Sequence, residues 1–319
     1  MPSHPYPSAR TAAAPAAPAT AASVAEVDPV ELTAAVQQAL GSPGFRAPTL
    51  PGVALEVMQL AARPNVQFEE LVRVLQRDPV LAARVLSIAQ SAFYAARSPI
   101  ISLHQAAIRL GLQTLRDLVL EAALNLEIFR VPGYDDLMAR LYSHSTAVAH
   151  VARAVCRRTL VNAEYAFLCG LLHDVGFAAA LLAVVERPEW RRLPMETLSP
   201  VLDAVHVDAS GLLARTWRLP PALQQLVAHH HDVVVNGRAE QANAALVVAE
   251  QLCWEAGAGM LDPPDDADPY ATATPEPPLE GLDVNWTGVL DEARKALKLG
   301  DEALLAARGE AFGLVSRLG

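Results

Sequence analysis

Apolar residues recur at helical spacing along most of the chain. After Phe68 they fall at i+3, i+4 and i+7, and the same pattern returns after Pro79. This spacing places apolar side chains on one face of an α-helix. No stretch alternates apolar and polar residues over five or six positions, and the short run Val233–Val235, followed by Asn236-Gly237, indicates a loop. The pattern therefore predicts an all-α fold.

Capping and helix-breaking residues mark the ends of several predicted helices. Asp78 followed by Pro79 is typical of a helix start, with the aspartate as cap and the proline in the first turn. Ser102, with a glutamine three residues later, forms a capping box. Gly111 is expected to stop that helix, and Pro132-Gly133 to separate it from the next.

Two stretches lack the helical pattern. Residues 1–28 are rich in Ala, Pro, Ser and Thr, and residues 262–282 combine six prolines with many acidic residues. Such compositions bury too little apolar surface to order themselves, so we expect a disordered tail and an exposed loop. The remaining chain is expected to form one domain over 29–261, divided at about 131–134, and C-terminal helices over 283–319 that pack back on it.

Composition limits which classes of partner are expected and in which cellular compartment the protein is expected. The net charge is −10, from 25 Lys and Arg against 35 Asp and Glu, and an acidic surface disfavours nucleic acid as a partner. The longest apolar run, Val175–Val185, is shorter than the roughly 18–20 residues of a membrane span, so no membrane association is expected. Cys156, Cys169 and Cys253 form no CxxC pair and lie in apolar stretches. We expect buried, reduced thiols, as in a cytoplasmic protein.

Two predicted helices carry a histidine on an otherwise apolar face. In the helix expected over 134–158, His144 fills the gap in a stripe that runs from Leu137 to Val155. In the next helix, His173 falls at i+7 from Ala166. Asp174 follows directly, and Gly176 is expected to end that helix. The side chains of His173 and Asp174 would then both lie at the C-terminal end of the helix, where they can bind the same ion.

The same feature returns further along the chain. His206 precedes an apolar helix face, and His230 falls at i+7 from Leu223 within the run His229-His230-His231-Asp232. Glu250 lies at i+4 from Leu246 on a helix that is apolar nearly all round.

These residues have two interpretations. A lone inward histidine is more often a hydrogen-bonded core residue than a ligand. A buried Glu250 is harder to explain in that way, because an unpaired buried carboxylate is costly and requires a cation or a donor. Imidazoles and carboxylates together favour Fe, Mn, Zn or Ni over Ca. We therefore expect the histidines, Asp174 and Glu250 to meet in one interior pocket that can bind a divalent metal.

The order of these residues resembles the HD superfamily of metal-dependent phosphohydrolases. The surrounding sequence is similar to its HDOD family, the HD-related output domain of bacteria, over about residues 45–254. The segments that carry the resemblance are LPGVALEVMQLAARPNVQFEELVRVLQRDPVLAARVLSIAQSAFY (50–94), SLHQAAIRLGLQTLRDLVL (102–120), HSTAVAHVA (144–152), AFLCGLLHDVG (166–176), HVDASGLLARTWRLP (206–220) and AHHHD (228–232).

The resemblance implies an all-α fold in which an N-terminal helical layer, about 29–131, packs on an HD-like helical core, about 134–256. It implies a bacterial signal-transduction module that acts through protein–protein contacts without catalysis. Response regulators and proteins of cyclic-dinucleotide pathways are the partners that it implies.

The alternative is a metal-dependent phosphohydrolase or phosphodiesterase, with His173 and Asp174 as catalytic candidates. The metal-ligand candidates are His144, His173, Asp174, His206, His229, His230 and Glu250. The chain departs from HD enzymes at Glu250, where they carry Asp, and at Phe177, where many carry Lys. It also lacks the Gly-Tyr-Pro triplet of the members that cleave cyclic-di-GMP. These departures favour the regulatory module over the enzyme.

Overall fold

The computed structural model describes most of the chain. The described residues are 28–50, 52–61, 66–94, 100, 102–191, 193–260 and 286–318. The expected tail, apart from Asp28, and the expected Pro-rich loop over 262–282 lie outside these ranges.

The described residues confirm the all-α prediction, with one small hairpin added. The first part of the chain forms α1 (Pro29–Leu40), α2 (Gly52–Ala61), α3 (Phe68–Gln76), α4 (Pro79–Ala89), the 3-10 turn η1 (Ala92–Tyr94) and α5 (Leu103–Glu127). The second part forms α6 (Asp135–Cys156), α7 (Ala163–Leu172), α8 (Val175–Val185), α9 (Met195–Thr216), α10 (Pro221–Ala228), β1 (Val234–Val235), β2 (Arg238–Ala239) and α11 (Gln241–Glu255). The last two helices are α12 (Trp286–Leu297) and α13 (Asp301–Leu318).

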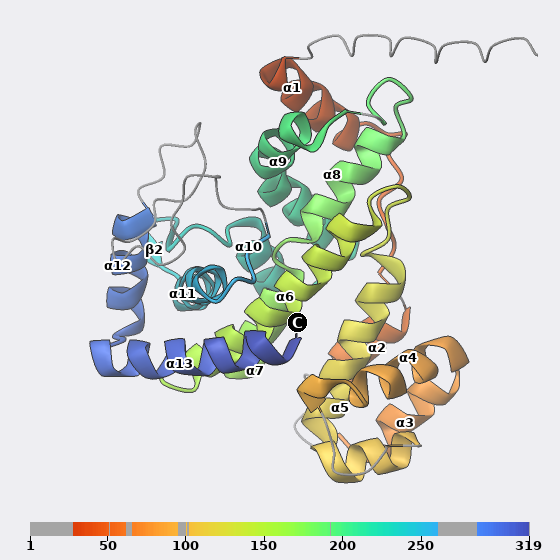
Figure 1. Cartoon of the computed structure of the whole chain (residues 1–319), viewed down its shortest axis with the longest axis vertical. Coiled ribbons are helices and arrows are strands. Elements are labelled where there is room, and N and C mark those ends of the chain that lie inside the picture. Colours follow the sequence, from red (N-terminus) through yellow and green to blue (C-terminus); the bar gives the residue numbers. More distant parts are fainter. Residues whose placement is uncertain are drawn as a thin grey trace, which may run out of the picture.

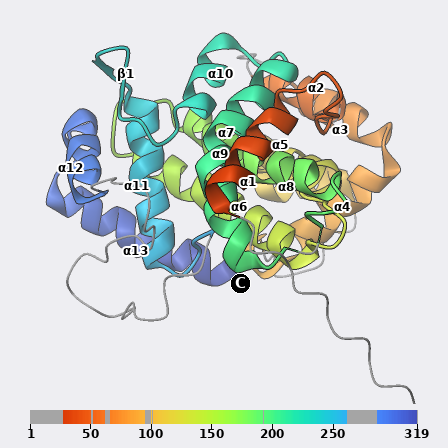
Figure 2. The same cartoon turned by 90° about the horizontal axis from the view of Figure 1, so that it is seen from above.

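The helices form a smaller lobe and a larger core (Figure 1). In the lobe, α2, α3 and α4 pack around α5. In the core, α6 pairs with α7, α8 pairs with α9, and α11 lies against α6. Although α1 precedes the lobe in sequence, it packs on α8 and α9 of the core, as the view from above also shows (Figure 2). Helix α12 lies against α11, and α13 lies against α6.

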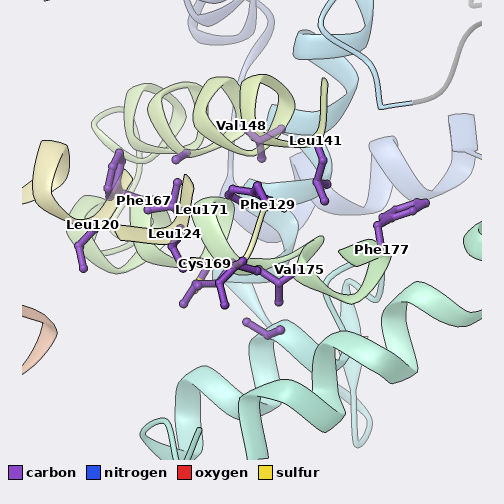
Figure 3. Packing of buried hydrophobic residues seen from close by; sticks show 14 of the residues in the cluster. Leu120, Leu124, Phe129, Leu141, Val148, Phe167, Cys169, Leu171, Val175 and Phe177 are labelled. Carbon is purple, nitrogen blue, oxygen red and sulfur yellow. The ribbon is translucent and has the colours of Figure 1, made fainter. Parts of the chain in front are cut away.

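The interior is built mainly from Ala, Val and Leu. Figure 3 shows side chains of α6, α7 and α8, among them Val148, Cys169 and Val175, meeting in one apolar cluster. The stretch Ala163–Val185, which comprises α7 and α8, is long and apolar enough to cross a membrane by length and composition alone, but 83% of its most apolar window is buried inside the protein. Burial in the core accounts for its apolar character.

The expected helix starts are confirmed. An Asp78 side-chain oxygen accepts hydrogen bonds from the backbone N–H groups of Val80 (3.1 Å) and Leu81 (3.0 Å). The Ser102 hydroxyl oxygen accepts one from Gln105 N–H (3.1 Å). The expected break at Gly111 is present as a residue with φ of +85°, but the chain resumes the helix directly and α5 continues to Glu127.

Two local predictions were wrong. Val234 and Val235 pair with Arg238 and Ala239 in a hairpin, because Asn236 and Gly237 both adopt positive φ and close a tight turn. Gly176 does not end a helix: α7 stops at Leu172, and Gly176 lies in the first turn of α8. Glycine is needed there because a Cβ would lie 1.9 Å from the backbone oxygen of His206 on α9.

A buried ion network connects the lobe to the core. On α6, Arg153 donates to Asp117 of α5 (2.7 Å) and to Glu164 of α7 (3.1 Å), and its guanidinium lies 4.0 Å from the ring centre of Phe167. Arg116 of α5 also pairs with Glu164. Together these contacts hold α5 against the α6–α7 pair.

A second polar cluster lies close to this network. His150 Nε2 lies 3.0 Å from a carboxylate oxygen of Glu121 on α5. The hydroxyl of Tyr94 contacts both groups, at 3.1 Å each. The lobe is thus joined to the core by polar contacts as well as by apolar packing.

Candidate metal centre

Asp174 lies at the centre of four imidazoles. Its Oδ2 is 3.3 Å from Nε2 of His144 and 3.3 Å from Nε2 of His173. Its Oδ1 is 3.6 Å from Nε2 of His206 and 3.4 Å from Nε2 of His230. All five side chains are buried. One carboxylate therefore faces two pairs of histidines, one pair with each oxygen.

Glu250 of α11 reaches the same place. Its Oε1 lies 3.6 Å from Nε2 of His173, and its Oε2 lies 3.4 Å from Nε2 of His231. The extra methylene of a glutamate, relative to the aspartate of HD enzymes, therefore does not keep the carboxylate away from the histidines.

The donor atoms form two groups, each within 4.8 Å. We call them the first group, which comprises His144, His173 and Asp174, and the second group, which comprises His206, His230 and His231. Asp174 and Glu250 each contact histidines of both groups.

The backbone fixes the orientation of the imidazoles. Nδ1 lies close to a backbone carbonyl oxygen in His144 (2.8 Å), His173 (2.7 Å), His206 (2.5 Å) and His230 (2.9 Å). A carbonyl oxygen only accepts, so Nδ1 carries the hydrogen, and Nε2 of the neutral ring presents a lone pair. A histidine that binds a metal is commonly held in this way by its other ring nitrogen.

Within this centre, three buried acceptors lack a hydrogen-bond partner among the described residues. They are Asp174 Oδ1, His230 Nε2 and Glu250 Oε1. Leaving such atoms unpaired in the interior is costly, and bound cations would satisfy them. Imidazole and carboxylate donors suit Fe, Mn, Zn or Ni. The residues present therefore fit a metal.

Opposite charges shift the pKa values of the first group. Burial alone would lower the pKa of His173, but the adjacent Asp174 carboxylate outweighs it and raises the pKa to about 9. Burial alone would raise the pKa of Asp174, but His173, together with His144 and His230, holds it well below its ordinary value. The carboxylate is therefore ionised at any physiological pH.

In the second group, the pKa values of the three histidines shift in different directions. Burial lowers the pKa of His206 to about 3 and also lowers that of His230, so both imidazoles are neutral at physiological pH. Burial alone would lower the pKa of His231, but the nearby Glu250 carboxylate outweighs this effect and raises it. Burial would raise the pKa of Glu250, but His231 and His173 lower it to about 2.

Close helix contacts bring the ligands together. Gly170 of α7 lies so near α6 that a Cβ would be 2.7 Å from the Cα of Ala149, which holds His173 beside His144. The hydroxyl oxygen of Ser210 on α9 accepts a hydrogen bond from Gly176 N–H at 2.8 Å. That contact holds the start of α8, and with it Asp174, against the helix that carries His206.

The structure places the predicted residues as follows. It brings together His144, His173, Asp174, His206, His230 and Glu250. His229 lies apart: its side chain is 44% exposed, and its Nδ1 lies 3.0 Å from a carboxylate oxygen of Asp232. We therefore remove His229 from the candidate ligands.

His231 takes the place that was predicted for His229. Helix α10 ends at Ala228, so the three histidines lie on a turn, to which helical periodicity does not apply. The run of three histidines was the only signal in the sequence. It did not reveal which neighbours of His230 face inward.

Phe177 forms an apolar wall of the centre. Its ring stacks on His206 with centroids 4.5 Å apart and an angle of 22° between the planes. At this position many HD enzymes carry a lysine, so here an aromatic contact replaces a positive charge.

A helical core that gathers buried histidines around a His-Asp pair defines an HD-like protein. A sequence model of the HDOD domain family matches residues 47–233, which is more than half of the chain. The chain belongs to the HDOD family.

Among curated proteins, the chain is 25% identical over 196 residues to an uncharacterized protein of Treponema pallidum (strain Nichols). It is 29% identical over 140 residues to ribonuclease Y of Thermus thermophilus. The matches cover 58% and 40% of this chain, but only 38% and 21% of those proteins. The chain therefore spans less than half the length of either relative.

Solved structures share the fold. An HDOD domain protein of unknown function from Geobacter sulfurreducens has a TM-score of 0.62 at 23% identity, covering 92% of this chain and 99% of that one. A protein of Shewanella amazonensis SB2B, provisionally named a metal-dependent phosphohydrolase, has a TM-score of 0.62 at 18% identity, covering 90% and 99%. A provisionally named signal transduction protein of Marinobacter aquaeolei VT8 has a TM-score of 0.55 at 22% identity, covering 92% and 68%.

Proposed function

We propose that this chain is a cytoplasmic signal-transduction module whose HD-like core binds a pair of divalent transition-metal ions. The supporting observation is Asp174, a buried carboxylate that faces the Nε2 atoms of two pairs of histidines and has an oxygen without a hydrogen-bond partner among the described residues. The signalling role comes from the HDOD family. Other signalling proteins, such as response regulators or proteins of cyclic-dinucleotide pathways, are the proposed partners.

In this proposal each group holds one ion. His144, His173 and Asp174 hold the first, and His206, His230 and His231 hold the second, with Asp174 reaching both and Glu250 placed between them. Where a backbone carbonyl accepts from Nδ1, it orients the ring so that Nε2 faces the centre. When bound, such ions supply a Lewis acid for an anionic ligand and lower the pKa of coordinated water.

Hydrolysis of a phosphoester is the second candidate function. It is favoured by the accessible edge of the centre, where His231 is 31% exposed and Glu250 13% exposed, while the other ligands are nearly enclosed. A phosphate oxygen could approach the centre there. Glu250 lies at this edge with its carboxylate ionised, so it can accept a hydrogen bond from a water there and orient it.

Metal analysis of protein purified without a histidine tag tests the proposal. We expect two Fe, Mn, Zn or Ni ions per chain in the wild type. Asp174→Ala should lose both ions, because its carboxylate faces both groups. The matched histidine variants are His173→Ala, expected to lose metal, and His229→Ala, expected to keep both ions. Full retention of metal by His173→Ala and Asp174→Ala would contradict the proposed centre.

An assay of the loaded protein against cyclic dinucleotides, nucleotides and a generic phosphodiester separates the two functions. Turnover that disappears in Asp174→Ala but not in His229→Ala would establish the hydrolase. A loaded wild type that turns over none of them, and captures a signalling partner in a metal-dependent way, would establish the regulatory module.

A further inference from the structure

The ligands His230 and His231 lie on a segment without regular structure. Helix α10 ends at Ala228, and strand β1 begins only at Val234. A turn closes between these elements, with the Asp232 N–H donating to the His229 carbonyl at 2.8 Å. Its position relative to the rest of the centre is therefore set by other contacts.

Asn243 fastens this turn to α11. Its side chain is fully buried, and its amide nitrogen donates to the backbone oxygen of His229 and, at 3.1 Å, to that of Asp232. These two carbonyls lie directly before His230 and directly after His231. One amide group thus holds both ends of the two-residue segment that supplies the ligands.

Helix α11 contacts the turn at a second point. Glu250 lies seven residues after Asn243, on the same helix face, and its carboxylate is 3.4 Å from Nε2 of His231. The helix therefore holds the backbone of the turn with Asn243 and an imidazole of the turn with Glu250. The hydrogen bonds described for the Asn243 side chain go to this turn, whereas the residues of the first group lie on α6 and at the α7–α8 junction.

We infer that Asn243 is the positioning residue of the second group: its two hydrogen bonds set where His230 and His231 present Nε2. This inference rests on the proposed metal centre. Partners that orient metal ligands typically contribute about 10–100-fold to metal affinity. Loss of the Asn243 donors should therefore weaken the second ion and leave the first unchanged.

The test uses the full chain and Co(II) as the probe, followed by visible absorption and calorimetry. Asn243→Asp keeps the shape of the side chain but removes both donors and adds a charge. Asn243→Leu is of similar size and removes the donors without a charge, so an effect shared by both variants comes from the lost hydrogen bonds. The matched control is Asn236→Asp in the exposed hairpin turn, where aspartate tolerates positive φ.

In both Asn243 variants we expect an unchanged first binding step and a second step weakened at least about tenfold. The absorption of the loaded variants should approach that of His231→Ala, in which a ligand of the second group is missing. Asn236→Asp should match the wild type. Circular dichroism of the metal-free chains checks that the variants fold. If Asn243→Asp does not fold, the metal affinity of Asn243→Leu tests the inference.

Each result has a distinct meaning. If both Asn243 variants bind two Co(II) ions with wild-type affinity and absorption, the inference fails and the proposed function stands. Equal weakening of both steps also overturns the inference, because it would mark a general structural role. A wild type that binds fewer than two ions overturns the proposed centre and this inference with it.

Discussion

Two glycines inside helices have opposite surroundings. At Gly176 of α8 a Cβ would lie 1.9 Å from the His206 backbone oxygen, whereas at Gly309 of α13 nothing described lies within 4 Å. We predict that Gly176→Ala lowers the free energy of unfolding by about 3 kcal/mol or more, because α8 and α9 must move apart. Gly309→Ala should raise it by about 0.5–1 kcal/mol, because alanine favours the helix. Urea denaturation of the metal-free chains measures both.

The two substitutions are chemically identical, so they serve as each other's control. Equal effects on stability would mean that the close approach of α8 and α9 does not exist. Because Gly176 lies two residues after Asp174, its substitution should also reduce metal binding.

Some of the candidate metal ligands could be predicted from the sequence and others could not. His144 and His173 were predictable because each fills a position in a helical apolar stripe. His231 was not, because it lies on a turn held by a tertiary hydrogen bond from Asn243. The role of Gly176 was also hidden, since the sequence does not show which helix approaches it.

At the scale of elements, the Arg153 network decides how the lobe meets the core. Asp117 is buried, and burial raises its pKa despite the hydrogen bond from Arg153. We predict that Arg153→Met lowers the free energy of unfolding by about 3 kcal/mol, because it leaves a buried carboxylate without its main partner. Adding Asp117→Asn should recover part of that loss. The measurement is a double-mutant cycle by chemical denaturation.

Arg157→Met, at the residue that directly follows α6, is the matched control. Arg157 is 55% exposed and pairs with Glu310 at 2.7 Å, so its loss should change stability by less than about 1 kcal/mol. An Arg153→Met variant as stable as Arg157→Met would show that the network contributes nothing at this interface.

Most helices were predictable because their apolar spacing and caps agree. The junction of α7 and α8 was not, because the chain turns at His173-Asp174 while the sequence remains apolar on both sides. The position of α1 on the core was equally hidden, since it depends on contacts with α8 and α9, which are distant in sequence.

At the scale of the whole molecule, buried thiols make stability sensitive to alkaline pH. Burial raises the pKa of Cys156 from 9.0 to about 12 and also raises those of Cys169 and Cys253. Above about pH 9 the unfolded chain releases thiol protons that the folded chain keeps, so stability falls as pH rises. We predict a loss of up to about 1.4 kcal/mol per thiol for each pH unit above that value. Urea denaturation with a metal chelator at about pH 8 and pH 10 tests this.

The variant Cys156→Ala checks the cause. It removes one of the three thiols, so its stability should fall less steeply with pH than that of the wild type. A wild-type stability that stays constant up to about pH 10 would contradict the burial of these groups.

The α6–α7 hairpin has a consequence for how the molecule can respond to a partner. Arg153 lies nine residues after His144 on α6, and Glu164 lies nine residues before His173 on α7, about 13 Å along each helix axis. Gly170, packed against Ala149 between these ends, leaves the two rods no room to slide past each other. A displacement of α5 would therefore move α6 and α7 as one body, and the spacing between the imidazoles of His144 and His173 would be preserved.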